Sequence, residues 1–152
     1  MTTAKLLAER ARASAGLDFL RSIRDGELPP APIQETLGFS LAEVDEGRVV
    51  FTAIPGEQHY NPIGVVHAGL AATMLDSSMG AAVHSTLPEG SGYTTLETKF
   101  NLTRAITAET GEIRAEGSVV HRGRRVATAE GRVTRVSDGK LVASGTSTCL
   151  IV

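Results

Sequence analysis

The segment from Val66 to His84 most constrains the fold, because its apolar residues would lie on nearly every face of a helix. A helix that is apolar all round must be enclosed by other elements. Gly69 and Gly80 interrupt the segment with small residues, which allow another backbone to come close. We therefore predict a helix over residues 66–84 at the centre of the domain.

Strand-like runs flank this helix on both sides. Before it, residues 39–44 and 48–54 surround the tight turn Asp45-Glu46-Gly47. After it the hydrophobic period changes to two, and four long runs rich in Val, Thr and Ile follow, at 93–103, 112–121, 124–135 and 140–151. We expect these four runs to form an antiparallel meander.

The run 93–103 alternates most cleanly between apolar and polar positions. Its expected core face carries Leu96, Thr98, Phe100 and Leu102, and the residues between them are polar. One curved antiparallel sheet wrapped around one helix is the economical way to bury both elements, which gives an α+β fold.

The first 32 residues differ from the rest of the chain. Residues 3–24 are rich in Ala, Leu and Arg and predict a helix that breaks or kinks at Gly16. The segment from Gly26 to Pro32 contains three prolines and predicts an extended connection. We expect residues 1–32 to be a helical appendage with a proline-rich linker, and residues 33–152 to be the main domain.

Charge and cysteine content restrict the possible partners. The chain has 15 Lys and Arg against 17 Asp and Glu, a net charge of −2, which argues against bulk binding of nucleic acid. Charged residues interrupt any apolar run in the first twenty positions, and polar residues within 58–75 make that stretch a poor membrane span. The single Cys149 excludes an intrachain disulfide. We expect a cytoplasmic protein with no nucleic-acid and no membrane partner.

Asp76 is the most informative residue, because it lies inside the apolar helix. Burying a carboxylate costs several kcal/mol unless it is hydrogen-bonded, paired or used in chemistry. The alternative is structural: Asp76 could restart the helix as an N-cap ahead of two serines.

A second cluster, from Asn61 to Gly69, lies at the start of the same helix. The first N–H groups of a helix have no intrahelical acceptor and lie at its positive end, so they suit a developing oxyanion. The alternative is that Asn61-Pro62 is an ordinary turn and His67 a structural histidine.

The residues Asn61, Gly64-Val-Val-His67-Ala-Gly69-Leu and Leu75-Asp76-Ser together resemble the signature loop and helix of the hotdog-fold acyl-CoA thioesterases of the phenylacetate-pathway (PaaI-like) group. The resemblance extends from about residue 33 to the end of the chain. It implies a hotdog fold and hydrolysis of a short-chain or aromatic acyl-CoA. It also implies that the helix carboxylate, here Asp76, acts as general base or nucleophile.

The same resemblance implies roles for the loop. The backbone N–H of Ala68 would form the oxyanion hole, Asn61 would orient the nucleophile or water, and His67 would support the loop geometry next to Gly69. The family's common His-Gly-Gly is His67-Ala68-Gly69 here, and the extra β-carbon narrows the site. A hydroxyl from the strand after the helix would come from Thr94 or Thr95, and Leu75 and Met79 are expected in the pocket wall.

The expected site needs two chains. His67 and Asp76 are nine residues apart, about 13 Å along a helix, so they cannot crowd one atom of one subunit. Hotdog domains pair by joining their sheets, so the resemblance implies a homo-oligomer with shared sites, a dimer or a dimer of dimers (a homotetramer). It implies no cofactor, coenzyme A being part of the substrate.

An arginine-rich turn, Arg122-Gly123-Arg124-Arg125, is a candidate for binding the phosphates of coenzyme A, because guanidinium groups match phosphate geometry. The alternative is a solvated hairpin tip. Nucleic acid is a weaker idea, since no stacking aromatics accompany the arginines.

The sequence also allows other functions. A hotdog dehydratase would require a histidine base where this chain has Asn61. A non-catalytic acyl-CoA binder or sensor would have little reason to hold Asp76 in an apolar helix. A metal site is the weakest idea, because the four histidines show no compact ligand spacing.

Overall fold

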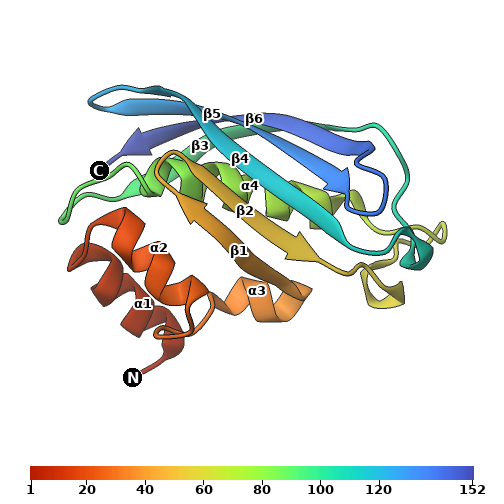
Figure 1. Cartoon of the computed structure of the whole chain (residues 1–152), viewed down its shortest axis with the longest axis horizontal. Helices are drawn as coiled ribbons and strands as arrows, with labels where there is room; N and C mark the ends of the chain where they lie inside the picture. The colour runs from red at the N-terminus through yellow and green to blue at the C-terminus, as the bar shows by residue number, and fades with distance from the viewer.

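The computed structural model describes residues 1–152 and contains four helices and six strands (Figure 1). The helices are α1 (Thr3–Arg12), α2 (Gly16–Arg24), α3 (Pro32–Leu37) and α4 (Ala68–His84). The strands are β1 (Phe39–Asp45), β2 (Arg48–Ala53), β3 (Tyr93–Leu102), β4 (Ile113–Arg122), β5 (Val126–Arg135) and β6 (Leu141–Ile151). Two short 3-10 turns, η1 (Glu57–His59) and η2 (Ala108–Thr110), complete the structure.

All six strands form one antiparallel sheet that curves around α4, in the order β1-β2-β4-β5-β6-β3 (Figure 1). This is the predicted α+β arrangement of one sheet around one long helix. The core lies between them: Met74, Leu75 and Met79 of α4 are fully buried.

The predicted meander is wrong in one respect. β4, β5 and β6 do follow one another, but β3 pairs with β6 at the far edge, and β4 pairs with β2 instead. β3 follows α4 directly and lies at the edge of the sheet opposite to β1. β1 and β3 therefore form the two edges of the sheet.

A row of glycines brings the sheet close to the helix. Gly117, Gly131 and Gly145 are aligned across β4, β5 and β6. A Cβ on Gly117 would overlap the backbone of Ser78, and a Cβ on Gly131 would lie 2.9 Å from the Leu75 side chain. Without side chains at these inward positions, α4 can pack directly on the strands.

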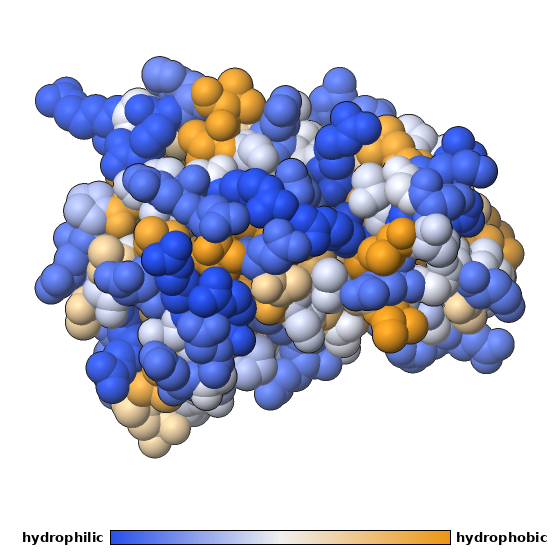
Figure 2. Space-filling model, viewed as in Figure 1, coloured by the Kyte–Doolittle hydropathy of each residue, from blue (hydrophilic) through white to orange (hydrophobic).

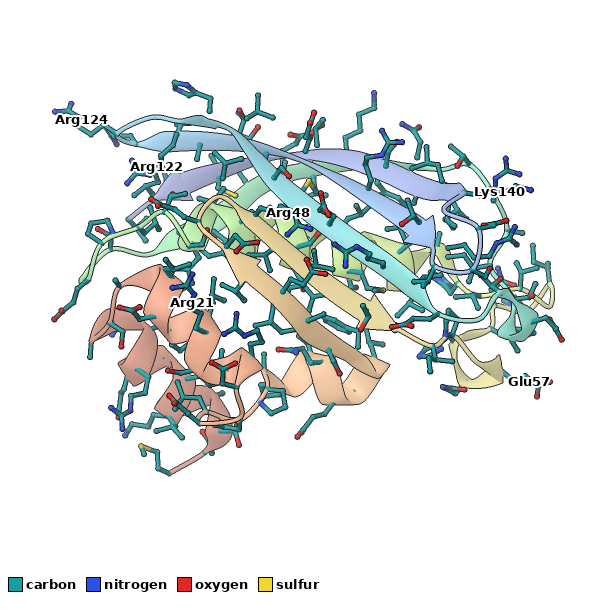
Figure 3. All side chains as sticks on the ribbon, viewed as in Figure 1. Arg21, Arg48, Glu57, Arg122, Arg124 and Lys140 are labelled. Carbon is teal, nitrogen blue, oxygen red and sulfur yellow. The ribbon has the colours of Figure 1, made fainter.

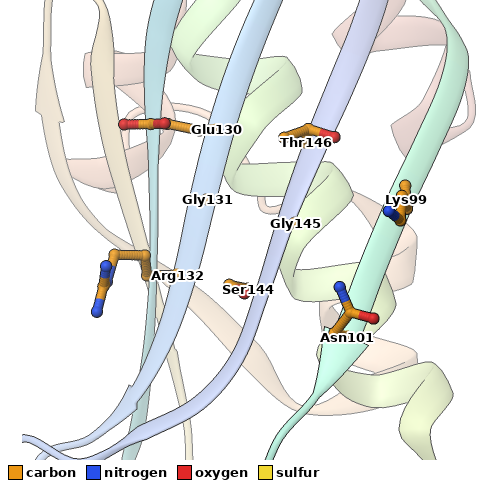
Figure 4. Close-up of a pocket in the computed structure, with 8 residues that line it drawn as sticks. All are labelled: Lys99, Asn101, Glu130, Gly131, Arg132, Ser144, Gly145 and Thr146. Carbon is orange, nitrogen blue, oxygen red and sulfur yellow. The ribbon is translucent and has the colours of Figure 1, made fainter.

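The opposite face of the same strands is polar. Figure 4 shows Lys99, Asn101, Glu130 and Arg132 there with Ser144 and Thr146, around a shallow hollow of about 290 Å³. More widely, Figure 2 shows hydrophilic residues over most of one face, with apolar residues only in small separate groups. None of the helices combines the length and the apolarity that crossing a bilayer demands.

The N-terminal helices pack on the domain. The predicted break occurs before Gly16, where α2 begins against α4: a Cβ at Gly16 would overlap the backbone carbonyl of His84. Leu7 of α1 and Phe19 of α2 belong to the same buried cluster as α4. α1 and α2 thus form a layer that packs beneath β1 (Figure 1).

α3 was not predicted. It runs from Pro32 to Leu37, and the residue that follows, Gly38, adopts a left-handed conformation with φ of 68°. Proline at the first helical position and glycine after the last are ordinary signals of helix boundaries. The sequence therefore contained the information needed to predict α3.

Candidate active site

Asp76 lies in the middle of α4, on its half-buried face. Its Oδ1 accepts hydrogen bonds from the hydroxyls of Thr95, at 3.1 Å, and Thr98, at 3.2 Å. Oδ2 accepts none within the chain. One carboxylate oxygen is therefore held in place and the other is available. Because Asp76 lies within the continuous helix, it is not an N-cap.

A β-bulge brings the two hydroxyls to the same carboxylate. In the pairing of β3 with β6 the register shifts between Thr95 and Glu97, so Leu96 has no partner. Without that extra residue, side chains three positions apart would point to opposite faces of the strand. The bulge lets Thr95 and Thr98 both face α4.

The structure corrects the predicted alternation of β3. Leu96, expected on the core face, is 59% exposed because it is the bulged residue. Of the two candidate threonines, Thr95 contacts Asp76 and Thr94 is exposed. Thr98 was missed as a site residue, although a threonine on an otherwise apolar face was a usable signal.

Two neighbouring cavities open on this side of α4. One, of about 300 Å³, is lined by Ala72, Thr73, Asp76, Thr98 and Phe100. The other, of about 390 Å³, extends to the helix start, where Thr73 also lines it together with Leu37, Gln58, His59, Tyr60, His67, Gly69 and Leu70. Since Thr73 borders both, the carboxylate and the start of α4 belong to one continuous surface.

The loop before α4 is held by its own polar groups. Asn61 Oδ1 accepts from the backbone N–H groups of Ile63 and Val65, at 3.1 and 3.3 Å. His67 is the N-cap of α4, and its Nδ1 accepts from the N–H of Gly69 at 2.8 Å. Asn61 and His67 therefore fix the loop geometry.

This capping leaves a free donor at Ala68. Its N–H makes no hydrogen bond in the turns and caps at the helix start, whereas Gly69 is capped and Leu70 donates to the His67 carbonyl. The free N–H lies at the positive end of the helix. It is the position suited to receiving an oxyanion.

One chain does not bring all the predicted residues together. Ala68 and Asp76 are eight residues apart in α4, about 12 Å along the axis. Figure 3 shows Arg122 and Arg124 at the opposite end of the sheet from Glu57 of η1. Arg122, Arg124 and Arg125 are exposed. The hairpin is thus remote from the α4 start of its own chain.

Leu75 and Met79, expected in the pocket wall, have a different role. Both are 0% exposed and pack against Gly131 of β5. They face the sheet, and neither lines the two cavities beside Asp76. We correct that expectation: these two side chains form the core beneath the site.

Asp76 affects two neighbouring acids. Burial raises the pKa of the Tyr93 hydroxyl well above its usual range, and the Asp76 charge raises it further. Burial likewise raises the pKa of the Cys149 thiol, with a smaller contribution from Asp76. Both groups therefore stay protonated at neutral pH.

Comparisons with known proteins identify the family. The family model of the Thioesterase superfamily matches residues 63–142, which include α4 and β3. Acyl-coenzyme A thioesterase 13 of Homo sapiens is 30% identical over 110 residues, covering 72% of this chain and 76% of the relative.

Solved structures agree as well. A phenylacetic acid degradation-related protein of Ralstonia eutropha is 31% identical with a TM-score of 0.76, covering 86% of this chain and 98% of that one. The PaaI protein of E. coli, at 19% identity, shares the fold with a TM-score of 0.76, covering 88% and 93%. The resemblance predicted from the loop and helix is confirmed. The chain belongs to the Thioesterase superfamily and has the hotdog fold.

Proposed function

We propose that the protein hydrolyses a short-chain or aromatic acyl-CoA to the free acid and CoA, with Asp76 as general base or nucleophile. The observation that carries this proposal is the Asp76 carboxylate: Oδ1 is fixed by two threonine hydroxyls, while Oδ2 is unpaired beside a cavity. Membership of a thioesterase family supports the reaction class. The reaction needs no cofactor beyond the CoA of the substrate.

Two chemical routes fit this geometry. As a general base, Asp76 takes a proton from water, whose oxygen attacks the thioester carbonyl carbon; the C–S bond then breaks and the CoA sulfur takes up a proton. As a nucleophile, Oδ2 attacks the same carbon and expels CoA, and water then hydrolyses the mixed anhydride. Both routes place negative charge on the carbonyl oxygen, which the Ala68 N–H would stabilise.

A second copy of the chain would complete the site. The outer edge of β3 has no strand partner, and Leu96 on that edge is exposed. Unpaired edges of long strands are ready templates for another strand. Pairing of β3 with β3 around a twofold axis would set the helix start of one chain beside Asp76 of the other, as an isologous dimer.

The arginine hairpin fits the nucleotide end of coenzyme A. Arg122, Arg124 and Arg125 are exposed and close in sequence, and Arg122 donates to the carbonyl of Gly123. Their exposed guanidinium groups suit phosphates, and Arg122 has further N–H groups besides the one that donates to Gly123. Because the hairpin is remote from the α4 start of its own chain, this role would require the extended length of CoA or the arrangement in an oligomer.

The test is free-thiol release from acetyl-, hexanoyl-, decanoyl- and phenylacetyl-CoA by the native protein and by Asp76→Asn. We expect turnover by the native protein and a loss of about 100-fold or more in kcat for Asp76→Asn, as for removal of a general base. Asp18→Asn, which changes an exposed carboxylate of α2, is the matched control and should keep full activity.

Two results would contradict the proposal. Wild-type turnover by Asp76→Asn would exclude Asp76 from the chemistry. Binding of acyl-CoA without any turnover would instead favour a non-catalytic acyl-CoA sensor on the same fold.

A further inference from the structure

A cavity of about 310 Å³ lies between the N-terminal helices and the domain, separate from the two cavities beside Asp76. Its outer wall is apolar and comes from Leu7 and Ala11 of α1 and from Phe19 and Ile23 of α2. Phe51 of β2 contributes to the inner wall. These residues precede residue 63, so they lie outside the region that the family model matches.

The wall nearest the site is polar. Ser77 and His84 of α4 and Tyr93 of β3 line it, and none of their side chains hydrogen-bonds to another residue. Every fully buried polar side-chain atom in the protein has a hydrogen-bond partner. Since the polar atoms of these three side chains have none, they are not fully buried and face open space. We call this polar side of the cavity its mouth and the apolar remainder its depth.

The mouth adjoins the candidate site where α4 packs on β3. Ser77 follows Asp76 in α4, and Tyr93 precedes Thr95, the Asp76 partner, on the same face of β3. A Cβ at Gly80 would lie 2.6 Å from the Tyr93 hydroxyl, so this tyrosine packs directly on α4 about one helical turn from Asp76.

We propose that this cavity receives the acyl group of the thioester and sets the length of the acyl chain that the Asp76 site accepts. The inference rests on the proposed thioesterase function. A thioester held at Asp76 has a polar CoA arm and an apolar acyl arm. The polar mouth suits the carbonyl end, the apolar depth suits the tail, and the CoA arm is left to solvent.

The volume indicates the substrate class. A cavity of about 150 Å³ holds one benzene molecule, so the present one has room for an aromatic ring with a short substituent or for a linear chain of about eight to ten carbons. The ring of His84 lies 5.4 Å from that of Phe19 and 5.6 Å from that of Tyr93, measured between centroids. These three rings would pack on either kind of acyl group. A short acyl group would leave most of the cavity unused. Of the two classes in the proposed function, the cavity therefore favours the aromatic acyl group over the short-chain one, and it extends the range to linear chains of medium length.

The test fills the cavity from its outer wall. Ala11→Phe places a ring into it from α1, and Ala4→Phe, the control, adds the same ring at an exposed position about two helical turns earlier that does not line the cavity. We expect Ala11→Phe to lower kcat/KM for decanoyl-CoA by about tenfold or more, because each methylene denied burial costs about fourfold in affinity. Acetyl-CoA should change by less than about twofold, and Ala4→Phe should leave both substrates unchanged.

Equal losses for both substrates, or no loss for decanoyl-CoA, would overturn the proposal. A second arm measures binding of the non-hydrolysable decyl-CoA thioether against CoA alone. If the native protein binds the thioether more tightly than CoA, and Ala11→Phe does not, the cavity proposal is supported. That holds even if no acyl-CoA is turned over, because an absence of turnover would contradict only the proposed function. Equal binding of the thioether to both proteins would overturn the cavity proposal.

Discussion

The hydroxyl of Thr95 donates to Oδ1 of Asp76 over 3.1 Å, and this contact joins the edge strand β3 to the middle of α4. The bulge at Leu96 adds Thr98 to the same oxygen. The strand that positions the carboxylate also has an open outer edge. A partner chain pairing with β3 would therefore act directly on the strand that orients Asp76.

The first prediction concerns Thr98. Thr98→Val keeps the shape of the side chain and removes one hydrogen bond to Asp76, so the carboxylate should lose orientation. A hydrogen bond to a charged group contributes about 1.5–3 kcal/mol, so kcat should fall by about tenfold or more with little change in KM. Thr94→Val, on the same strand but exposed, is the control. Equal kcat values for the two variants would contradict the role of Thr98.

The arginine hairpin gives a second prediction. Replacing Arg124 and Arg125 by Ala should raise KM for acyl-CoA and leave KM for a thioester without the nucleotide unchanged, because the lost contacts are to phosphates. Lys140→Ala removes a cation at the opposite end of the sheet, as Figure 3 shows, and should leave both values unchanged. A similar rise for both substrates in the arginine variant would argue against phosphate binding.

A third prediction tests the row of glycines. Gly117→Ala would place a Cβ against the backbone of Ser78, which cannot move without shifting α4. The free energy of unfolding, measured in urea, should fall by about 3 kcal/mol. Gly92→Ala, where the nearest atom to a Cβ is 3.5 Å away, should change it by less than about 0.5 kcal/mol. A fully stable Gly117→Ala protein would show that α4 does not need this close approach.

A fourth prediction concerns pH. Burial between α2 and β3 lowers the pKa of His84 below its usual value of 6.5. The unfolded chain then binds more protons in this range, so the stability associated with neutral His84 is complete above pH 6.5 and is lost as the pH falls toward the lowered pKa.

Urea unfolding at about pH 7.5 and pH 5.5 checks this. The native protein should lose stability between the two values, and His84→Gln should lose less. His121→Gln, at an exposed histidine, is the control. An unchanged loss in His84→Gln would exclude His84 as its source.

The long periodic elements were predictable. The apolar segment predicted α4, and the six strands lie within a few residues of their predicted bounds, because hydrophobic period is a local property of the sequence. The position of β3 in the sheet was not predictable, since its pairing with β6 depends on contacts between segments far apart in the chain. The same holds for Thr95 and Thr98, because a bulge depends on the partner strand.

The candidate site residues divide in the same way, into those indicated by local sequence and those that depend on packing. Asp76 stood out as a charge in an apolar helix, and the free N–H at Ala68 follows from a helix start at this loop. Leu75 and Met79 were misplaced because α4 is apolar all round, so its sequence does not show which face packs on Gly131.

A mixing experiment tests most directly whether two chains share one site, as we propose. Ala68→Pro removes the proposed oxyanion donor at the first helical position, where proline is well tolerated, and His67 already has the extended conformation that precedes a proline, with φ −59° and ψ 133°. Asp76→Asn removes the carboxylate. Each variant alone should be inactive, whereas random co-assembly of the two should restore about a quarter of native activity, because half of the dimers would contain one intact site. Mixed dimers without activity would contradict the shared site.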